Sequence, residues 1–96
     1  MARDKTEISV GYAEVVELTN AVTSKASFQV DLGKVEIIVL NDGVSVTDSM
    51  SGWSYSQGEG ELNKNLSEFA GTVTGDGRVW ARGKGTAGSV VTVDHA

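Results

Sequence analysis

The alternation of apolar and polar residues over short segments is the feature that most constrains the fold of this chain. The clearest example runs from residue 22 to residue 32, where polar residues such as Ser27 and Gln29 separate the apolar ones. The apolar side chains fall on even positions: Val22, Ala26, Phe28, Val30 and Leu32. Successive side chains of a β-strand point to opposite faces, so this pattern predicts a strand with one buried face that ends at Gly33.

The most specific local signal is a turn sequence between two β-branched segments. Asn41-Asp42-Gly43 separates residues 35–40 from residues 44–47, and these turn residues tolerate the positive φ that tight hairpin turns require. We therefore expect the two segments to pair as a hairpin. The apolar run 37–40 predicts a strand covered on both faces, in the middle of a sandwich or at a subunit contact.

Further strands are expected on both sides of this hairpin. In residues 7–18, apolar side chains fall on even positions with one interruption, at Glu14. We interpret this segment as a strand with a bulge near residues 13–15; a helix over 12–22 is the alternative. Strand is preferred because Thr and Asn near residues 19–24 are poor interior helix formers. Nearer the C-terminus we expect a second hairpin over 72–81, turning at 75–77, and a last strand over 90–93.

Two segments allow more than one interpretation. Residues 48–61 are rich in Ser and Gly and predict either a long exposed loop or a weak strand. In residues 62–70, apolar side chains recur at helical spacing, and Asn65 and Glu68 resemble a capping pair. A short helix near 63–70 therefore competes with a strand through Phe69, Gly71 and Val73.

Composition supports a fold made almost entirely of strands and turns. Val, Gly, Ser and Thr make up 44 of the 96 residues, and these residues favour pleated strands and the turns between them. We predict an all-β domain, a small sandwich or barrel of six to eight short antiparallel strands. The domain is expected to span 7–94, after a disordered or extended arm at 1–6. Because valine offers less apolar area than Leu or Phe, we expect stability to come in part from self-association.

Several kinds of catalytic and cofactor site are excluded or disfavoured. The chain has no cysteine, which removes disulfides, thiolate nucleophiles and cysteine-based metal sites. Its one histidine, His95, lies one residue from the C-terminus, where we expect a frayed chain. Residues 83–88 match the G-x-G-x-x-G pattern, but the eight residues that follow predict a strand instead of the helix that a dinucleotide site needs. We expect neither enzyme activity nor a cofactor.

The carboxylates are expected to be solvated surface charge, as exposed carboxylates usually are. Glu59 and Glu61 share one segment, whereas glycosidase carboxylates face each other across a cleft. The carboxylates leave a site for a hard cation as an alternative, although no calcium-loop spacing supports one. Its candidate ligands are Asp42, Asp48, Glu59, Glu61 and Asp76.

Charge and hydropathy limit the partners and the compartment. The net charge of −5 disfavours nucleic acid, and no apolar run approaches the roughly 18 residues of a membrane span. No apolar stretch of a secretory signal follows the charged first residues, so we expect a chain that is cytoplasmic as synthesised, with virion association as a further expectation.

Two groups of residues are candidates for a binding site. Arg78, Trp80, Arg82 and Lys84 alternate with small apolar residues, which would place three cations and an indole on one strand face. Residues 75–88 carry a formal charge of +2 and the rest of the chain −7, so this basic stripe predicts contact with an acidic surface on a partner. Replacing Arg82 with Glu is then expected to weaken assembly.

Trp53 and Tyr55 form the second group. Two aromatic residues two positions apart in a Ser/Gly-rich segment are typical of a platform that stacks against sugars, although aromatic side chains more often anchor a loop to the core.

Taken together, these features predict a non-enzymatic structural or assembly subunit that binds copies of itself or a larger scaffold. In texture, this Val/Gly/Ser/Thr-rich β domain without Pro or Cys resembles minor structural proteins of bacterial viruses, such as capsid decoration or tail subunits. That resemblance implies a homo-oligomer associated with a virion. The alternative is a module that binds carbohydrate or another ligand through exposed Trp and Tyr.

Overall fold

The alternating segments form eight strands in the computed structural model, which describes residues 3–47, 50–68 and 76–95. The strands are β1 (Arg3–Val10), β2 (Val15–Glu17), β3 (Lys25–Leu32), β4 (Lys34–Asn41), β5 (Trp53–Ser56), β6 (Gly60–Asn65), β7 (Gly77–Gly83) and β8 (Ser89–His95). A single turn of 3₁₀ helix, η1 (Leu66–Glu68), follows β6.

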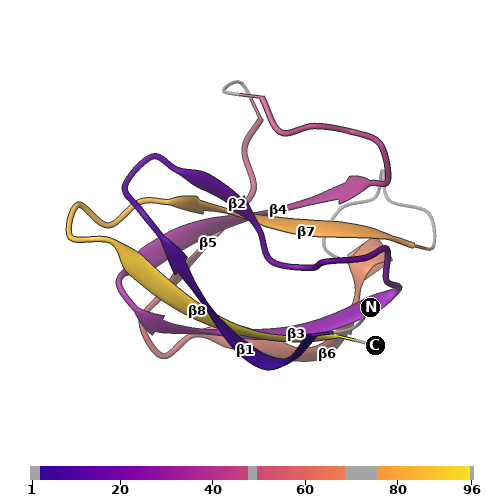
Figure 1. The fold of residues 1–96 in the computed structure, drawn as a ribbon, viewed down its shortest axis with the longest axis horizontal. Coiled ribbons are helices and arrows are strands. Elements are labelled where there is room, and N and C mark those ends of the chain that lie inside the picture. Colours follow the sequence, from indigo (N-terminus) through magenta and orange to yellow (C-terminus); the bar gives the residue numbers. More distant parts are fainter. Residues whose placement is uncertain (1–2, 48–49, 69–75, 96) are drawn as a thin grey trace.

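The strands form two four-stranded antiparallel sheets that pack face to face (Figure 1). Sheet A has the order β1-β8-β3-β6 and sheet B the order β2-β7-β4-β5. The predicted all-β fold is therefore confirmed, as a sandwich. Only β4 and β5 follow each other in the same sheet; each of the other consecutive strand pairs in these ranges crosses between the sheets.

Valine fills most of the space between the sheets. On β7 and β8 buried and half-buried residues alternate without interruption, because every second side chain points into the core. Among the fully enclosed side chains are Val10, Leu18, Val30, Val35, Ile37, Leu66, Val79, Val91 and Val93. Phe28 adds one buried aromatic ring, so most of the packing uses small β-branched groups.

The expected single strand over residues 7–18 is wrong. β1 ends at Val10 in sheet A and β2 begins at Val15 in sheet B. Between them, the N–H of Gly11 donates to the Glu14 carboxylate (2.9 Å) and the N–H of Glu14 donates to the Gly11 carbonyl (3.1 Å). This turn, with Ala13 at a φ of 63°, moves the chain to the other sheet where a bulge was predicted. The alternative helix over 12–22 does not form either.

The hairpin predicted around Asn41-Asp42-Gly43 is half right. The turn forms, since the N–H of Val44 donates to the Asn41 carbonyl (3.2 Å) and Gly43 has a φ of 85°. Residues 44–47, however, are not a strand. β4 pairs instead with β7 along one edge and with β5 along the other.

Both faces of β4 are covered, as its apolar run predicted. Five consecutive residues, 35–39, are buried. The inner face meets the core, and the outer face lies under residues 47 and 50–52, which are held there by contacts described below. A loop of the same chain thus covers the face for which a subunit contact was one expectation.

The ambiguous segments contain strands. Residues 53–56 and 60–65 are β5 and β6, and of the helix proposed near 63–70 the described residues contain the single turn η1. The competing strand through 69–73 lies outside the described residues. The N–H of Asn65 donates to the Glu68 carboxylate (3.2 Å), which is the predicted capping contact. Leu66 is buried at this point.

The predicted last strand lies within β8, and residues 3–6 of the proposed arm belong to β1. Most of the first half of the hairpin predicted over 72–81 lies outside the described residues; its second half, in β7, pairs with β2 and β4.

Candidate interaction surfaces

The basic stripe occupies the outer face of sheet B. Arg78, Trp80 and Arg82 are partly exposed there, whereas the residues between them are buried. Lys84 follows the end of β7 and is exposed. Arg78, Trp80 and Arg82 therefore share one face of β7, as predicted.

Carboxylates of the same chain pair with these cations. Arg78 donates from Nε to Asp42 (2.8 Å) and from Nη1 to Glu17 (2.8 Å), and these hydrogen bonds, with Asp42 first, raise the pKa of its guanidinium. Lys84 Nζ lies 3.9 Å from a Glu36 oxygen. Much of the charge that sequence alone assigned to a partner is thus neutralised within the chain.

Arg82 is the centre of a buried clamp. Its side chain is 13% exposed and pairs at 2.9 Å with Glu36, whose side chain is 10% exposed. The same guanidinium donates to the carbonyls of Thr47 and Met50, both at 2.8 Å, while Glu36 accepts the N–H of Gly52 (2.9 Å). Two opposite charges on β7 and β4 therefore hold residues 47, 50 and 52 of the loop after β4 against the sheet. The role that the contacts support for Arg82 is structural.

Trp53 and Tyr55 do not form a joint platform, because their side chains differ in environment. The Tyr55 ring packs edge-on against Phe28, with centroids 4.9 Å apart, and its hydroxyl donates to Glu61 (3.1 Å). Burial, followed by the hydrogen bond and negative charge of Glu61, raises the pKa of Tyr55 to about 12. Trp53 remains 61% exposed.

A groove of about 350 Å³ lies beside the exposed indole. Its lining joins β5 to β6 and η1 through Trp53, Ser54, Tyr55, Lys64 and Glu68. A flat aromatic ring next to one amine and one carboxylate offers stacking and hydrogen bonds to a polar ligand.

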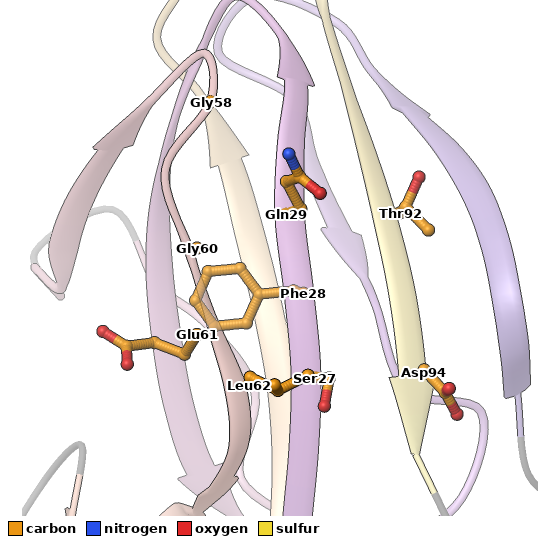
Figure 2. A pocket seen from close by; sticks show the side chains of 9 residues that line it. All are labelled: Ser27, Phe28, Gln29, Gly58, Gly60, Glu61, Leu62, Thr92 and Asp94. Carbon is orange, nitrogen blue, oxygen red and sulfur yellow. The ribbon is translucent and has the colours of Figure 1, made fainter.

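A larger groove, of about 550 Å³, crosses the outer face of sheet A. Figure 2 shows Gln29, Thr92 and Asp94 over the adjacent strands β3 and β8. Leu62 on β6 lines it too and is 87% exposed. Sequence reasoning missed this surface, because each of its strands alone shows only an ordinary solvated face.

The acidic residues of the described ranges form no metal centre. No group of three or more His, Cys, Asp or Glu side chains in this part of the chain is placed to hold an ion. Asp42 binds Arg78, Glu59 accepts the N–H of Ser56 (2.6 Å), and Glu61 accepts the hydroxyl of Tyr55. Asp48, another predicted candidate, lies outside the described residues.

The expectation of a frayed end at His95 is wrong. The residue is 4% exposed, and its Nε2 accepts the N–H of Asn20 (3.3 Å). The imidazole fills the end of the core because β8 continues through residue 95 between β1 and β3.

Within the ranges that the structure describes, no helix has the length and apolarity to cross a membrane. Comparison with protein-family models, with curated proteins and with solved structures finds no match to this chain.

Proposed function

We propose that this protein is a non-enzymatic assembly subunit, a small β-sandwich that binds copies of itself and takes part in a larger protein scaffold. A virion component, such as a capsid decoration or tail subunit, is the setting that the composition favours. The observation that carries the proposal is the exposure of several large apolar side chains.

Three of these side chains lie mostly in solvent while valine fills the core. Tyr12 is 62% exposed, Trp53 61% and Leu62 87%. Burying a side chain of this size contributes about 1.5–3 kcal/mol, which the isolated chain forgoes at each position. A partner that covers these residues recovers that free energy, so the surface is better suited to an assembled state than to a monomer.

The internal ion pairs indicate what kind of contact to expect. Because Arg78 and Arg82 already bind carboxylates of their own chain, they have little charge left for a partner. We therefore expect association to depend on apolar contact and to persist in salt that screens exposed charges. Among the cations of the basic stripe, Lys84 is best placed for an additional contact, because its side chain is exposed.

Light scattering over a range of concentrations tests the proposal. The expected result is a mass above the 10.1 kDa of one chain that changes little when salt is added. Leu62→Ser should weaken association if that side chain is covered, whereas Gln57→Ser on an exposed turn should not. A mass of one chain at every concentration contradicts self-association.

A second candidate function is the binding of a carbohydrate or a similar polar ligand at Trp53. The specific observation is its exposed indole beside Lys64 and Glu68 in the groove described above. Fluorescence titration with oligosaccharides should quench the wild type and Trp80→Phe but not Trp53→Phe. Absence of quenching in all three proteins contradicts this function.

A further inference from the structure

The four sheet edges differ in how well they resist the addition of another strand. Exposed edges are templates for pairing with other chains, and proteins block them with short strands, bulges and inward-pointing charges. The edges here are β1 and β6 in sheet A and β2 and β5 in sheet B.

Three of these edges are blocked. β2 has three residues and β5 has four, so neither offers much backbone. β6 contains a bulge in which Asn63 has a φ of 54°. Its charged residues Glu61 and Lys64 also stand opposite the buried Phe28 and Ala26, on the inner face.

β1 is the edge that remains. It has eight residues, and from Thr6 to Val10 its register with β8 is regular. The irregularity in that register lies before Thr6. Five consecutive residues of regular register therefore present a backbone edge on the side away from β8.

The same side of the sandwich carries incompletely covered apolar groups. Ile8 on β1 and Val16 on β2 pack against the core but remain partly exposed. A single turn joins the two strands (Figure 1), and Tyr12 in that turn is 62% exposed. A strand added beside β1 would extend the apolar layer between the two sheets at this edge.

Symmetry selects the register if the added strand is β1 of a second copy. Residues directly opposite each other in an antiparallel pair share a face, so the twofold axis must lie midway between one residue and its own copy on the second strand. An axis at Glu7 would place two carboxylates together. An axis at Ile8 uses all of Thr6–Val10, sets Ile8 against its copy on the inner face, and sets Glu7 against Ser9, whose hydroxyl can donate to it.

We propose that two copies of this chain associate through β1, antiparallel and with Ile8 at the twofold axis, so that the two A sheets become one. This inference rests on the proposed self-association and names one of its contacts, at the edge next to Tyr12; Trp53 on β5 and Leu62 on β6 lie at other edges. The complementary Glu7 and Ser9 positions and the free edge favour a second copy over an unrelated strand.

The absence of cysteine from the chain makes a direct test possible. In Ile8→Cys, the two single thiols should oppose each other with Cβ atoms about 4.5–5.5 Å apart, close enough for a disulfide after small adjustment. The matched control is Thr6→Cys on the same face. Its two copies would be separated by four residues along the strands, roughly 13 Å, and should not link.

Charge substitutions on the outer face test the register without disturbing the core. Ser9→Glu sets a carboxylate against Glu7 twice per dimer and should raise the dissociation constant about tenfold, whereas Ser9→Lys should lower it. Glu7→Lys combined with Ser9→Glu should restore association. Gln57→Glu controls for net charge, and circular dichroism confirms that each variant is folded.

The outcomes separate the two proposals. Association that survives Ser9→Glu, without preferential linking of Cys at position 8, overturns the β1 contact and leaves self-association standing. A wild-type chain that is monomeric at every concentration contradicts both. If β1 instead pairs with a strand of a different protein, the isolated chain would be monomeric at every concentration.

Discussion

Tyr55 shows how one side chain closes a side of the sandwich. Its ring reaches from β5 across to Phe28 on β3, and its hydroxyl ends on Glu61 of β6. These contacts join an edge of sheet B to an edge of sheet A. They also favour the neutral phenol, because the phenolate would be partly buried beside a carboxylate.

Stability should therefore fall at high pH through Tyr55. Its pKa is raised from 10.0 unfolded to about 12 folded, so its contribution is fully present below pH 10 and is lost as pH rises to about 12. Urea unfolding across this window should show a smaller decline for Tyr55→Phe than for the wild type. In Glu61→Gln, phenolate absorbance should appear at lower pH; an unchanged titration would contradict the role of Glu61.

Gly52 is required by a close approach of two backbones. A Cβ at this position would lie 1.9 Å from the Ile37 carbonyl oxygen, so Gly52→Ala must displace the loop from the sheet. We expect a loss of at least about 2 kcal/mol, as is typical when a buried hydrogen-bonded contact is broken. Gly85→Ala is the control, since its nearest contacts would be at 3.4 Å, and thermal unfolding should find it close to wild type.

At the scale of elements, the described parts of the loop after β4, residues 42–47 and 50–52, work as a strap over β4 and β7. Arg82 and Glu36 lie on adjacent strands at opposed positions, and each also binds the strap backbone. The pairing explains why a buried glutamate is tolerated at the centre of an apolar strand.

Removing one member of this pair should be much more harmful than removing an exposed pair. Arg82→Met leaves the buried Glu36 with the longer ion pair to the exposed Lys84 (3.9 Å) and is expected to lose about 3 kcal/mol of stability, with faster proteolysis within the strap. Arg78→Met, whose partners Glu17 and Asp42 are more exposed, should lose far less. Equal losses would show that the clamp does not hold the strap.

The same clamp changes the meaning of a substitution at Arg82. Arg82→Glu would set two carboxylates against each other under the strap, so reduced assembly of that variant would report a loss of fold. Substitutions on the outer face of β1 avoid this problem, because Glu7 and Ser9 are exposed.

The whole molecule is assembled almost entirely from non-local strand pairs. β1 pairs with β8 and β2 with β7, so loops spanning most of the chain must close before the sheets form. Folds of this kind usually form in milliseconds to seconds.

Refolding should nevertheless lack the slow kinetic phase that prolyl isomerisation causes in many proteins. The chain contains no proline, so no prolyl isomerisation of tens to hundreds of seconds can limit folding. Stopped-flow fluorescence at low protein concentration should give one exponential. A slow phase that grows with concentration would be the association step; a slow phase independent of concentration would contradict simple folding.

Local residue patterns were sufficient for the fold class and for the orientation of most strands. The alternation in β3 and β7 separated their two faces, because which face a side chain takes depends only on its position along its own strand. Leu32 is the exception: the pattern placed it on the buried face of β3, but it is 51% exposed, beyond an irregularity in the pairing with β8 between Val30 and Leu32. Turn chemistry at Asn41 to Gly43 and the capping contact of Asn65 were also predictable, since both are made between residues a few positions apart.

Strand partners, by contrast, were decided only by the tertiary structure. β4 could pair with the segment after its turn or with β5, and residues 44–47 left the sheet because Arg82 and Glu36 hold the strap across its outer face. The basic stripe likewise looked like a binding site until its carboxylate partners, distant in sequence, came together around it. The alternation of apolar and polar residues is a property of a single strand and is visible in consecutive residues. Pairing and charge compensation depend on groups brought together from across the chain, and only the folded sandwich determines which of them meet.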